Sequence, residues 1–157
     1  MTSNTALEVR PLQESDRDDW TALWTAYLDF YGTSVPADTF ATYFDRLLDA
    51  NPQDFNGLVA VIDGKLVGLT HYLYHRHGWK VENVCYHQDL NADQSVRGIC
   101  VCRALIEAVY AAADANGTPS VYWLTQEENT EARKLYDRVA QVTNLLSTGG
   151  LPHETAA

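Results

Sequence analysis

The stretch from Tyr86 to Asn116 constrains the fold most, because it predicts a strand, a tight turn and a helix in succession. Residues 82–90 form an extended run. After it, apolar residues recur on one helical face, at Val101, Leu105, Ala108, Val109 and Ala112. Asn116-Gly117 is a typical helix end, because glycine takes the left-handed conformation without steric cost. A turn that opens a helix presents unpaired N–H groups and the positive end of the helix dipole, which favours phosphate as a ligand.

The residues before this stretch predict a strand, two helices and a hairpin. Leu7–Pro11 alternates and predicts a short strand. Two apolar stripes predict a helix that Gly32 ends and a second helix from about Ala37 to Ala50. These stripes are Trp20, Leu23, Trp24, Tyr27, Leu28 and Tyr31, then Phe40, Tyr43, Phe44, Leu47 and Leu48. Asp63-Gly64 joins two apolar runs, 57–62 and 65–75, and is the strongest short hairpin signal.

The residues after the central helix predict a strand at 121–124 and a last helix at about 130–140, with Asn129 as its N-cap. A terminal strand at 142–147 is one interpretation of the residues after that helix, and residues 149–157 are expected to form a disordered tail. The order of elements predicts an α+β fold in a single domain, 1–148. We expect a mixed, mostly antiparallel central sheet of six to seven strands, flanked in a sandwich-like arrangement by about four helices.

Composition argues against several classes of function. The net charge of −10 disfavours a nucleic-acid or membrane partner. It suits a cationic substrate such as an amine, although it equally serves solubility. No apolar stretch approaches the ~18 residues of a membrane span, and no signal peptide is visible. There are three cysteines, an odd number, and we expect a cytoplasmic protein. The histidines at 71, 75, 77 and 87 lack the compact spacing of zinc ligands, so no metal is expected.

Two motifs, in this order, resemble the GCN5-related N-acetyltransferase family. The first is the run 86–98, which is similar to that family's bulged strand and Arg/Gln-x-x-Gly-x-Gly/Ala loop before a long helix. The second is Asn129-x-x-Ala132-x-x-Leu135-Tyr136. With the helices before them, the resemblance covers nearly the whole chain and implies the acyl-CoA N-acyltransferase fold. Cys100 stands at a loop position where that family has Gly, and Cys102 stands at a position where it has Gly or Ala.

The resemblance implies transfer of an acetyl group from acetyl coenzyme A to a primary amine of a small molecule or peptide, and it allows a homodimer. It implies that backbone amides of 97–102 hold the pyrophosphate and that those of 90–92 polarise the thioester carbonyl. The implied coenzyme A site therefore comprises Leu90, Asn91, Ala92, Arg97, Gly98, Ile99, Cys100, Val101, Cys102, Arg103 and Asn129. The acceptor pocket is implied to be lined by Tyr27, Phe30 and Tyr31.

Two residues carry the implied proton transfers. Tyr136 would protonate the departing thiolate, although it also belongs to an apolar helix face. Asp89 would act as the base through water, or hydrogen-bond a loop instead. It lies on the side of the strand opposite Gln88 if alternation holds, and a bulge would change that parity. Two alternatives stay open: a reactive thiol at Cys100, and a non-catalytic member of the same fold that binds a ligand or partner. The loop that carries Cys100 and Cys102 is the feature that distinguishes an active enzyme from this non-catalytic alternative.

Overall fold

The structure is a computed structural model that describes residues 6–51, 55–96 and 100–150. The chain divides into two compact units, Met1–Leu124 and Thr125–Ala157. The first unit contains β1 (Leu7–Pro11), a 3-10 turn (Glu14–Asp16), α1 (Arg17–Phe30), α2 (Ala37–Leu48), β2 (Asn56–Ile62), β3 (Lys65–His75), β4 (Val84–Ala92), a second 3-10 turn (Gln94–Val96), α3 (Val101–Ala115) and β5 (Val121–Tyr122). The second unit contains α4 (Thr130–Val139).

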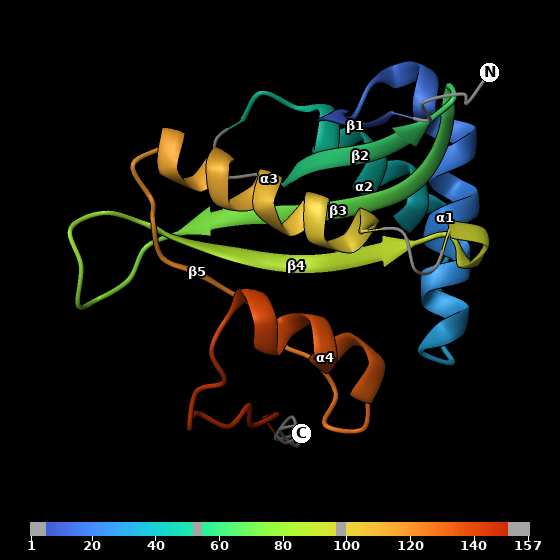
Figure 1. Cartoon of the computed structure of the whole chain (residues 1–157). Helices are drawn as coiled ribbons and strands as arrows, with labels where there is room; N and C mark the ends of the chain where they lie inside the picture. The colour runs from blue at the N-terminus through green and yellow to red at the C-terminus, as the bar shows by residue number, and fades with distance from the viewer. Residues whose placement is uncertain (1–5, 52–54, 97–99, 151–157) are drawn as a thin grey trace, which may run out of the picture. The chain divides into compact units, whose positions relative to one another are not determined.

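One sheet, in the order β1-β2-β3-β4-β5, forms the centre of the first unit (Figure 1). The first four strands are antiparallel neighbours, and β5 returns parallel to β4 after α3. This confirms the predicted α+β order of an antiparallel meander followed by one helical crossover. The hairpin between β2 and β3 turns at Asp63 and Gly64, whose φ angles are 51° and 76°. Both are left-handed, as a two-residue hairpin of this kind requires.

The predicted number of strands, six to seven, was too high, because the described residues form five. The terminal strand suggested at 142–147 is absent: residues 140–150 contain neither helix nor strand. Leu145 and Leu146 are 81% and 92% exposed. As adjacent residues they would point to opposite faces of a strand, so they cannot together cover one side of a sheet. Of the predicted tail, residues 151–157 lie outside the described part of the chain.

Helices cover both faces of the sheet. In Figure 1, α3 crosses one face while α1 and α2 lie behind the other. The α1/α2 face holds the largest core cluster, which includes the predicted core residues Leu23, Trp24 and Leu28. Two clusters on the α3 face bring Val101, Leu105, Val109 and Ala113 of α3 against the strands.

A glycine in β3 lets α3 lie close to the sheet. A Cβ at Gly68 would lie 2.8 Å from Cγ1 of Val101 and 3.1 Å from Cδ1 of Leu105, both on the first turns of α3. A contact of 2.8 Å is essentially never seen in folded proteins, so with any larger residue here Val101 or its helix would have to shift. Gly68 therefore sets the position at which α3 begins.

A bulge in β4 changes which face its side chains point to. His71 of β3 is opposite Asp89, but the next residue, Tyr72, is opposite His87, so Gln88 is extra. Before the bulge, Cys85 belongs to the cluster on the α3 face. After it, the side chain of Asp89 contacts Tyr43 of α2 on the opposite face. The bulge anticipated from the sequence therefore exists, and Asp89 points toward α1 and α2.

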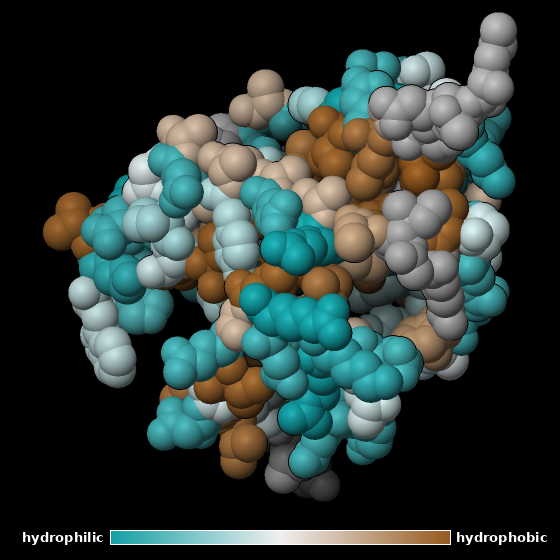
Figure 2. Space-filling view, in the orientation of Figure 1, coloured by the Kyte–Doolittle hydropathy of each residue, from teal (hydrophilic) through white to brown (hydrophobic). Residues whose placement is uncertain are grey.

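The sequence carries more acidic than basic residues. Hydrophilic residues cover much of the face seen in Figure 2, in keeping with 21 acidic and 11 basic residues. No helix among the described residues has the length and apolar character needed to cross a membrane.

Candidate functional site

The edge of β4 that faces β5 is only partly paired. β5 pairs with Cys85 and Tyr86 of β4, and in the described part of the chain no strand pairs with this edge from His87 to Ala92. Backbone N–H and C=O groups on such an edge are available to an extended ligand that carries amides. Leu90, Asn91 and Ala92, predicted to hold the cofactor, lie on this segment.

The side chains of these three residues anchor the strand. Leu90 and Ala92 pack into the cluster on the α3 face with Val101 and Leu105. Asn91 points to the other face, where its Nδ2 donates to the carbonyl oxygen of Leu23 in α1 at 3.0 Å. Their side chains are thus engaged with the two core faces, and the backbone of this segment lies along the partly paired edge.

The start of α3 is exposed at its N-cap residue, Cys100. Cys100 makes no side-chain capping hydrogen bond within the described residues. Its φ of −73° is ordinary, so a cysteine here carries no left-handed strain. The first-turn N–H groups receive no side-chain cap from Cys100 and lie at the positive end of the helix dipole, which fits a phosphate group.

The other predicted loop residues have different environments. Val101 is fully buried and anchors the helix to the sheet. Cys102 is half-buried. Arg103 is exposed, and its Nε donates to Oε1 of Glu107 at 2.8 Å. Arg97, Gly98 and Ile99 lie outside the described residues.

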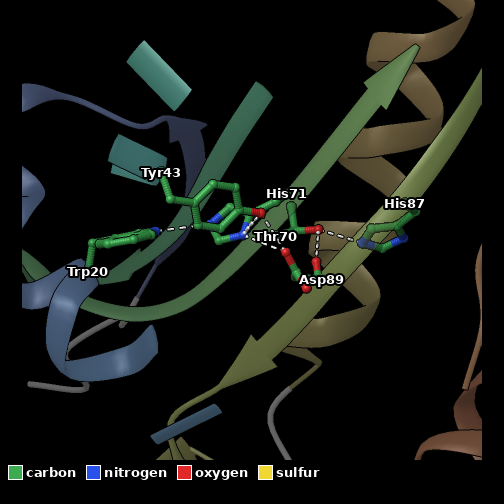
Figure 3. A network of polar contacts seen from close by, with 6 residues as sticks. All are labelled: Trp20, Tyr43, Thr70, His71, His87 and Asp89. Atoms are coloured by element: carbon green, nitrogen blue, oxygen red, sulfur yellow. Dashed lines mark hydrogen bonds and ion pairs between the residues drawn. The ribbon is translucent and has the colours of Figure 1, made fainter. Parts of the chain in front are cut away.

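A buried polar network connects α1, α2, β3 and β4 (Figure 3). Asp89 is 6% exposed, and its Oδ2 accepts a hydrogen bond from the Tyr43 hydroxyl at 2.7 Å. The same Oδ2 lies 2.9 Å from Nδ1 of His71. Nε2 of His71 in turn lies 2.9 Å from Nε1 of Trp20. Four side chains that are far apart in the sequence therefore meet on the α1/α2 face of the sheet.

The partners of His71 fix its tautomer. The indole N–H of Trp20 can only donate, so Nε2 of His71 must be an unprotonated acceptor. The proton of the neutral ring is therefore on Nδ1. This N–H is directed at Oδ2 of Asp89 and at the Tyr43 hydroxyl oxygen, 3.0 Å away. Burial, followed by the charge of Asp89, raises the pKa of Tyr43 and keeps its hydroxyl protonated.

A second pair lies on the opposite face of the same strands. The Thr70 hydroxyl donates to the Asp89 carbonyl oxygen at 2.8 Å and also contacts Nε2 of His87. Because that hydroxyl proton is already used, Nε2 of His87 is the donor to Thr70. Nδ1 of His87 is buried and has no hydrogen-bond partner among the described residues. Burial lowers the pKa of His87 to about 4, so the ring is neutral near pH 7.

An open pocket of about 600 Å³ lies between α2 and the bulge of β4. Its volume is within the usual range for small-molecule sites. It is lined by Pro36, Asp38, Thr39, Thr42, Tyr43, Arg46, Phe55 and Gln88. Tyr43 thus belongs both to the pocket wall and to the buried network, whereas Asp89 is not a lining residue.

The predicted acceptor residues form an aromatic row at the end of α1. The ring centroid of Tyr27 lies 4.8 Å from that of Trp24 and 5.0 Å from that of Tyr31. Phe30 and Tyr31 are also neighbours, at 5.2 Å, and both are exposed. None of Tyr27, Phe30 and Tyr31 lines the pocket beside α2.

The remaining predicted site residues belong to the second unit. Asn129 is the N-cap of α4, as predicted, but its side chain makes no capping hydrogen bond in the described part of the chain. Its Nδ2 instead contacts Oγ1 of Thr125 at 3.5 Å. Tyr136 lies on α4 and is half-buried.

Sequence reasoning identifies Asp89 but misses its partners. In the sequence, Tyr43 and Trp20 are members of apolar helix faces, and His71 is considered only as a metal ligand, a role that its spacing disfavours. Their polar atoms are the available signal, because a buried hydroxyl, indole N–H or imidazole needs a hydrogen-bond partner. No group of three or more His, Cys, Asp or Glu residues in the described ranges is arranged to hold a metal ion.

Comparisons with known proteins agree on one family. Residues 20–140 match the model of the acetyltransferase (GNAT) family. The chain is 37% identical over 142 residues to the D-amino-acid N-acetyltransferase HPA3 of Saccharomyces cerevisiae, covering 90% of this chain and 88% of that protein.

Solved structures show the same fold at lower identity. The aminoglycoside N-acetyltransferase AAC(6')-Iy, in complex with CoA, superposes with a TM-score of 0.83 at 17% identity, covering 96% of this chain and 98% of that one. A ribosomal-protein-alanine N-acetyltransferase from Brucella melitensis biovar Abortus 2308 gives a TM-score of 0.77 at 18% identity, covering 93% and 99%.

Proposed function

The chain belongs to the acetyltransferase (GNAT) family and is an N-acetyltransferase, and from this premise we propose that it acetylates the amine of a free amino acid with acetyl coenzyme A. The observation that carries the proposal is the 37% identity, over 90% of the chain, to a D-amino-acid N-acetyltransferase. A pocket of about 600 Å³ also suits a small acceptor better than a folded protein surface.

The first unit offers two places for acetyl coenzyme A. The unpaired edge of β4 at Leu90–Ala92 would take the amide-containing arm, and the uncapped start of α3 at Cys100–Arg103 would take the phosphates. When bound, the cofactor supplies a thioester from which the acetyl group passes to the amine. Arg97, Gly98, Ile99 and Asn129 remain proposed contacts on the strength of the motif alone.

The pocket beside α2 has the chemistry of an amino-acid site. Among its described lining residues Arg46 is the one cation and Asp38 the one anion, and Gln88 offers an amide. Arg46 takes part in none of the ion pairs among the described residues. We assign Arg46 to the acceptor carboxylate, because a guanidinium binds a carboxylate through two hydrogen bonds. Tyr27, Phe30 and Tyr31 would contact larger acceptor side chains.

Two groups are proposed for the proton transfers. Asp89 is the base, since the bulge turns its carboxylate toward the α2 side, where the pocket lies. Tyr136 is the acid that protonates the departing thiolate. General acid and base groups each contribute typically 10²- to 10⁴-fold to such reactions.

Location and assembly are further proposals. A cytoplasmic location is supported by three free cysteines, Cys85, Cys100 and Cys102. A homodimer is proposed from the family alone, and measuring the mass of the protein in solution tests it.

The test is a substrate panel read by mass spectrometry and by release of free thiol from acetyl coenzyme A. We expect acetylation of D-amino acids, with slower reaction of their L-enantiomers and of matched amines that lack the carboxylate. An aminoglycoside and an alanine-terminated peptide complete the panel. Acetylation of the aminoglycoside or the peptide alone would refute the amino-acid assignment. Absence of thiol release with every amine would favour a non-catalytic, ligand-binding role.

A further inference from the structure

On the basis of the acetyl transfer proposed above, we propose that the Tyr43 hydroxyl accepts the proton of the acceptor amine while it passes its own proton to Asp89. Tyr43 thereby becomes a catalytic residue, and Asp89 becomes the final proton acceptor behind it. His71 and Trp20 are positioning residues that hold this pair in place.

The need for an intermediary comes from burial. Asp89 is 6% exposed and does not line the pocket beside α2, so of the hydrogen-bonded pair only Tyr43 can meet an amine in the pocket. The hydroxyl of Tyr43 is 2.7 Å from Oδ2 of Asp89, well within the range for direct proton transfer. One side chain therefore connects the pocket to the buried carboxylate.

The geometry also gives the hydroxyl its direction. Its proton is donated to Asp89, and one oxygen lone pair faces the Nδ1–H of His71 at 3.0 Å. A tyrosine oxygen has a second lone pair, which remains for a proton arriving from the pocket. His71 is 1% exposed and cannot take the proton itself, because its Nε2 is occupied by the indole N–H of Trp20.

The transfer balances without any other reactant. One N–H bond of the acceptor ammonium breaks and an O–H bond forms on Tyr43, while the original Tyr43 O–H breaks and an O–H forms on Asp89. The amine is left with a free electron pair, Asp89 becomes a neutral acid, and Tyr43 is neutral before and after. Burial raises the pKa of Tyr43, which disfavours a phenolate and requires both protons to move together. The same hydroxyl returns the proton from Asp89 to water after the product leaves.

The test compares two isosteric tyrosine variants. Tyr43→Phe keeps the ring but removes the relay, so we expect kcat to fall about a hundredfold while KM for the amine changes less than threefold. Tyr74→Phe is the matched control. Its hydroxyl donates to the Ala112 carbonyl oxygen at 3.3 Å on the α3 face of the sheet. It should lose a similar hydrogen bond and keep wild-type kcat. Thermal unfolding of both variants verifies that they are folded.

A double variant separates a relay from two independent groups. Asp89→Asn should lower kcat about as much as Tyr43→Phe, and the combined variant should be no slower than the slower single one. Losses that multiply would overturn the relay, as would wild-type kcat in Tyr43→Phe. Wild-type protein that acetylates no amine would instead overturn the proposed function, and the relay with it.

Discussion

Among single residues, His87 has the environment with the most direct consequence for stability. Its folded-state pKa of about 4 lies below the ordinary value of 6.5, because burial disfavours the charged ring. The unfolded chain therefore takes up a proton between pH 6.5 and 4 that the folded chain does not. The contribution of His87 is fully present above about pH 6.5 and is lost as the pH falls toward 4.

We predict that the free energy of unfolding decreases by up to about 3 kcal/mol from this residue across that window, which is 2.5 pKa units at 1.36 kcal/mol each. Urea denaturation at several pH values between 7.5 and 4 measures it. In His87→Gln the free energy of unfolding should depend less steeply on pH. Subtracting the curve of this variant from that of the wild type removes the contribution of the carboxylates, which both proteins share. An identical slope in both proteins would mean that His87 is accessible to protons in the folded state.

Arg46 carries the prediction about acceptor choice. If its guanidinium binds the acceptor carboxylate, Arg46→Gln should raise KM for amino acids about 10- to 100-fold, the value of a hydrogen bond to a charged group. KM for amines without a carboxylate should hardly change. Arg76→Gln, an exposed arginine after β3, is the control. An equal rise in KM for both kinds of acceptor would remove Arg46 from carboxylate binding.

How far the site is predictable depends on the residue. Asp89 can be identified from the sequence because it lies in the strand of the family motif, where a carboxylate is expected. A bulge in that strand, which is also expected from the motif, changes the face to which Asp89 points. Tyr43 is not, because its spacing on α2 matches that of its apolar neighbours Phe40, Phe44 and Leu47. Only a partner 46 positions away, Asp89, distinguishes it from a core tyrosine. Contacts between such distant residues are absent from local sequence patterns.

At the scale of elements, local patterns predict most helices and strands. β1 and β3 have the predicted bounds, and the start of α3 at Val101 agrees with its apolar face. The Asp63-Gly64 turn is predictable because left-handed backbone is required there. The terminal strand is a wrong prediction, because a strand exists only where a neighbour can pair with it, and that depends on tertiary structure.

The close approach of α3 to β3 yields a prediction. Gly68→Ala introduces a methyl group 2.8 Å from Val101, and overpacking of this kind typically costs about 1–3 kcal/mol. The start of α3 should move, so we expect the dissociation constant of acetyl coenzyme A to rise. Isothermal titration together with thermal unfolding measures both effects. Gly78→Ala is the control, since nothing lies within 4 Å of its added Cβ. Unchanged binding in Gly68→Ala would separate the helix start from the cofactor site.

At the scale of the molecule, the main prediction is coupling between cofactor and folding. A ligand that binds only the folded state at 100 times its dissociation constant adds about 2.7 kcal/mol. For a chain of 157 residues this corresponds to a rise in Tm of about 5–10 °C. Differential scanning fluorimetry with acetyl coenzyme A measures the shift. No shift at millimolar concentration would contradict cofactor binding at the sites assigned above.

The one extra residue in β4 makes this enzyme sensitive to chain length in a way that substitutions do not reveal. Deleting Gln88 would remove the bulge and place Asp89 directly after His87, opposite the same residues of β3 as now, so Leu90 and Ala92 would keep the α3 face and Asp89 would keep facing Tyr43. Deleting Leu90 instead would exchange the two faces for the residues after it, because side chains alternate along a strand. Among natural variants, we therefore expect the loss of one residue from this strand to be accepted at the bulge and excluded after it.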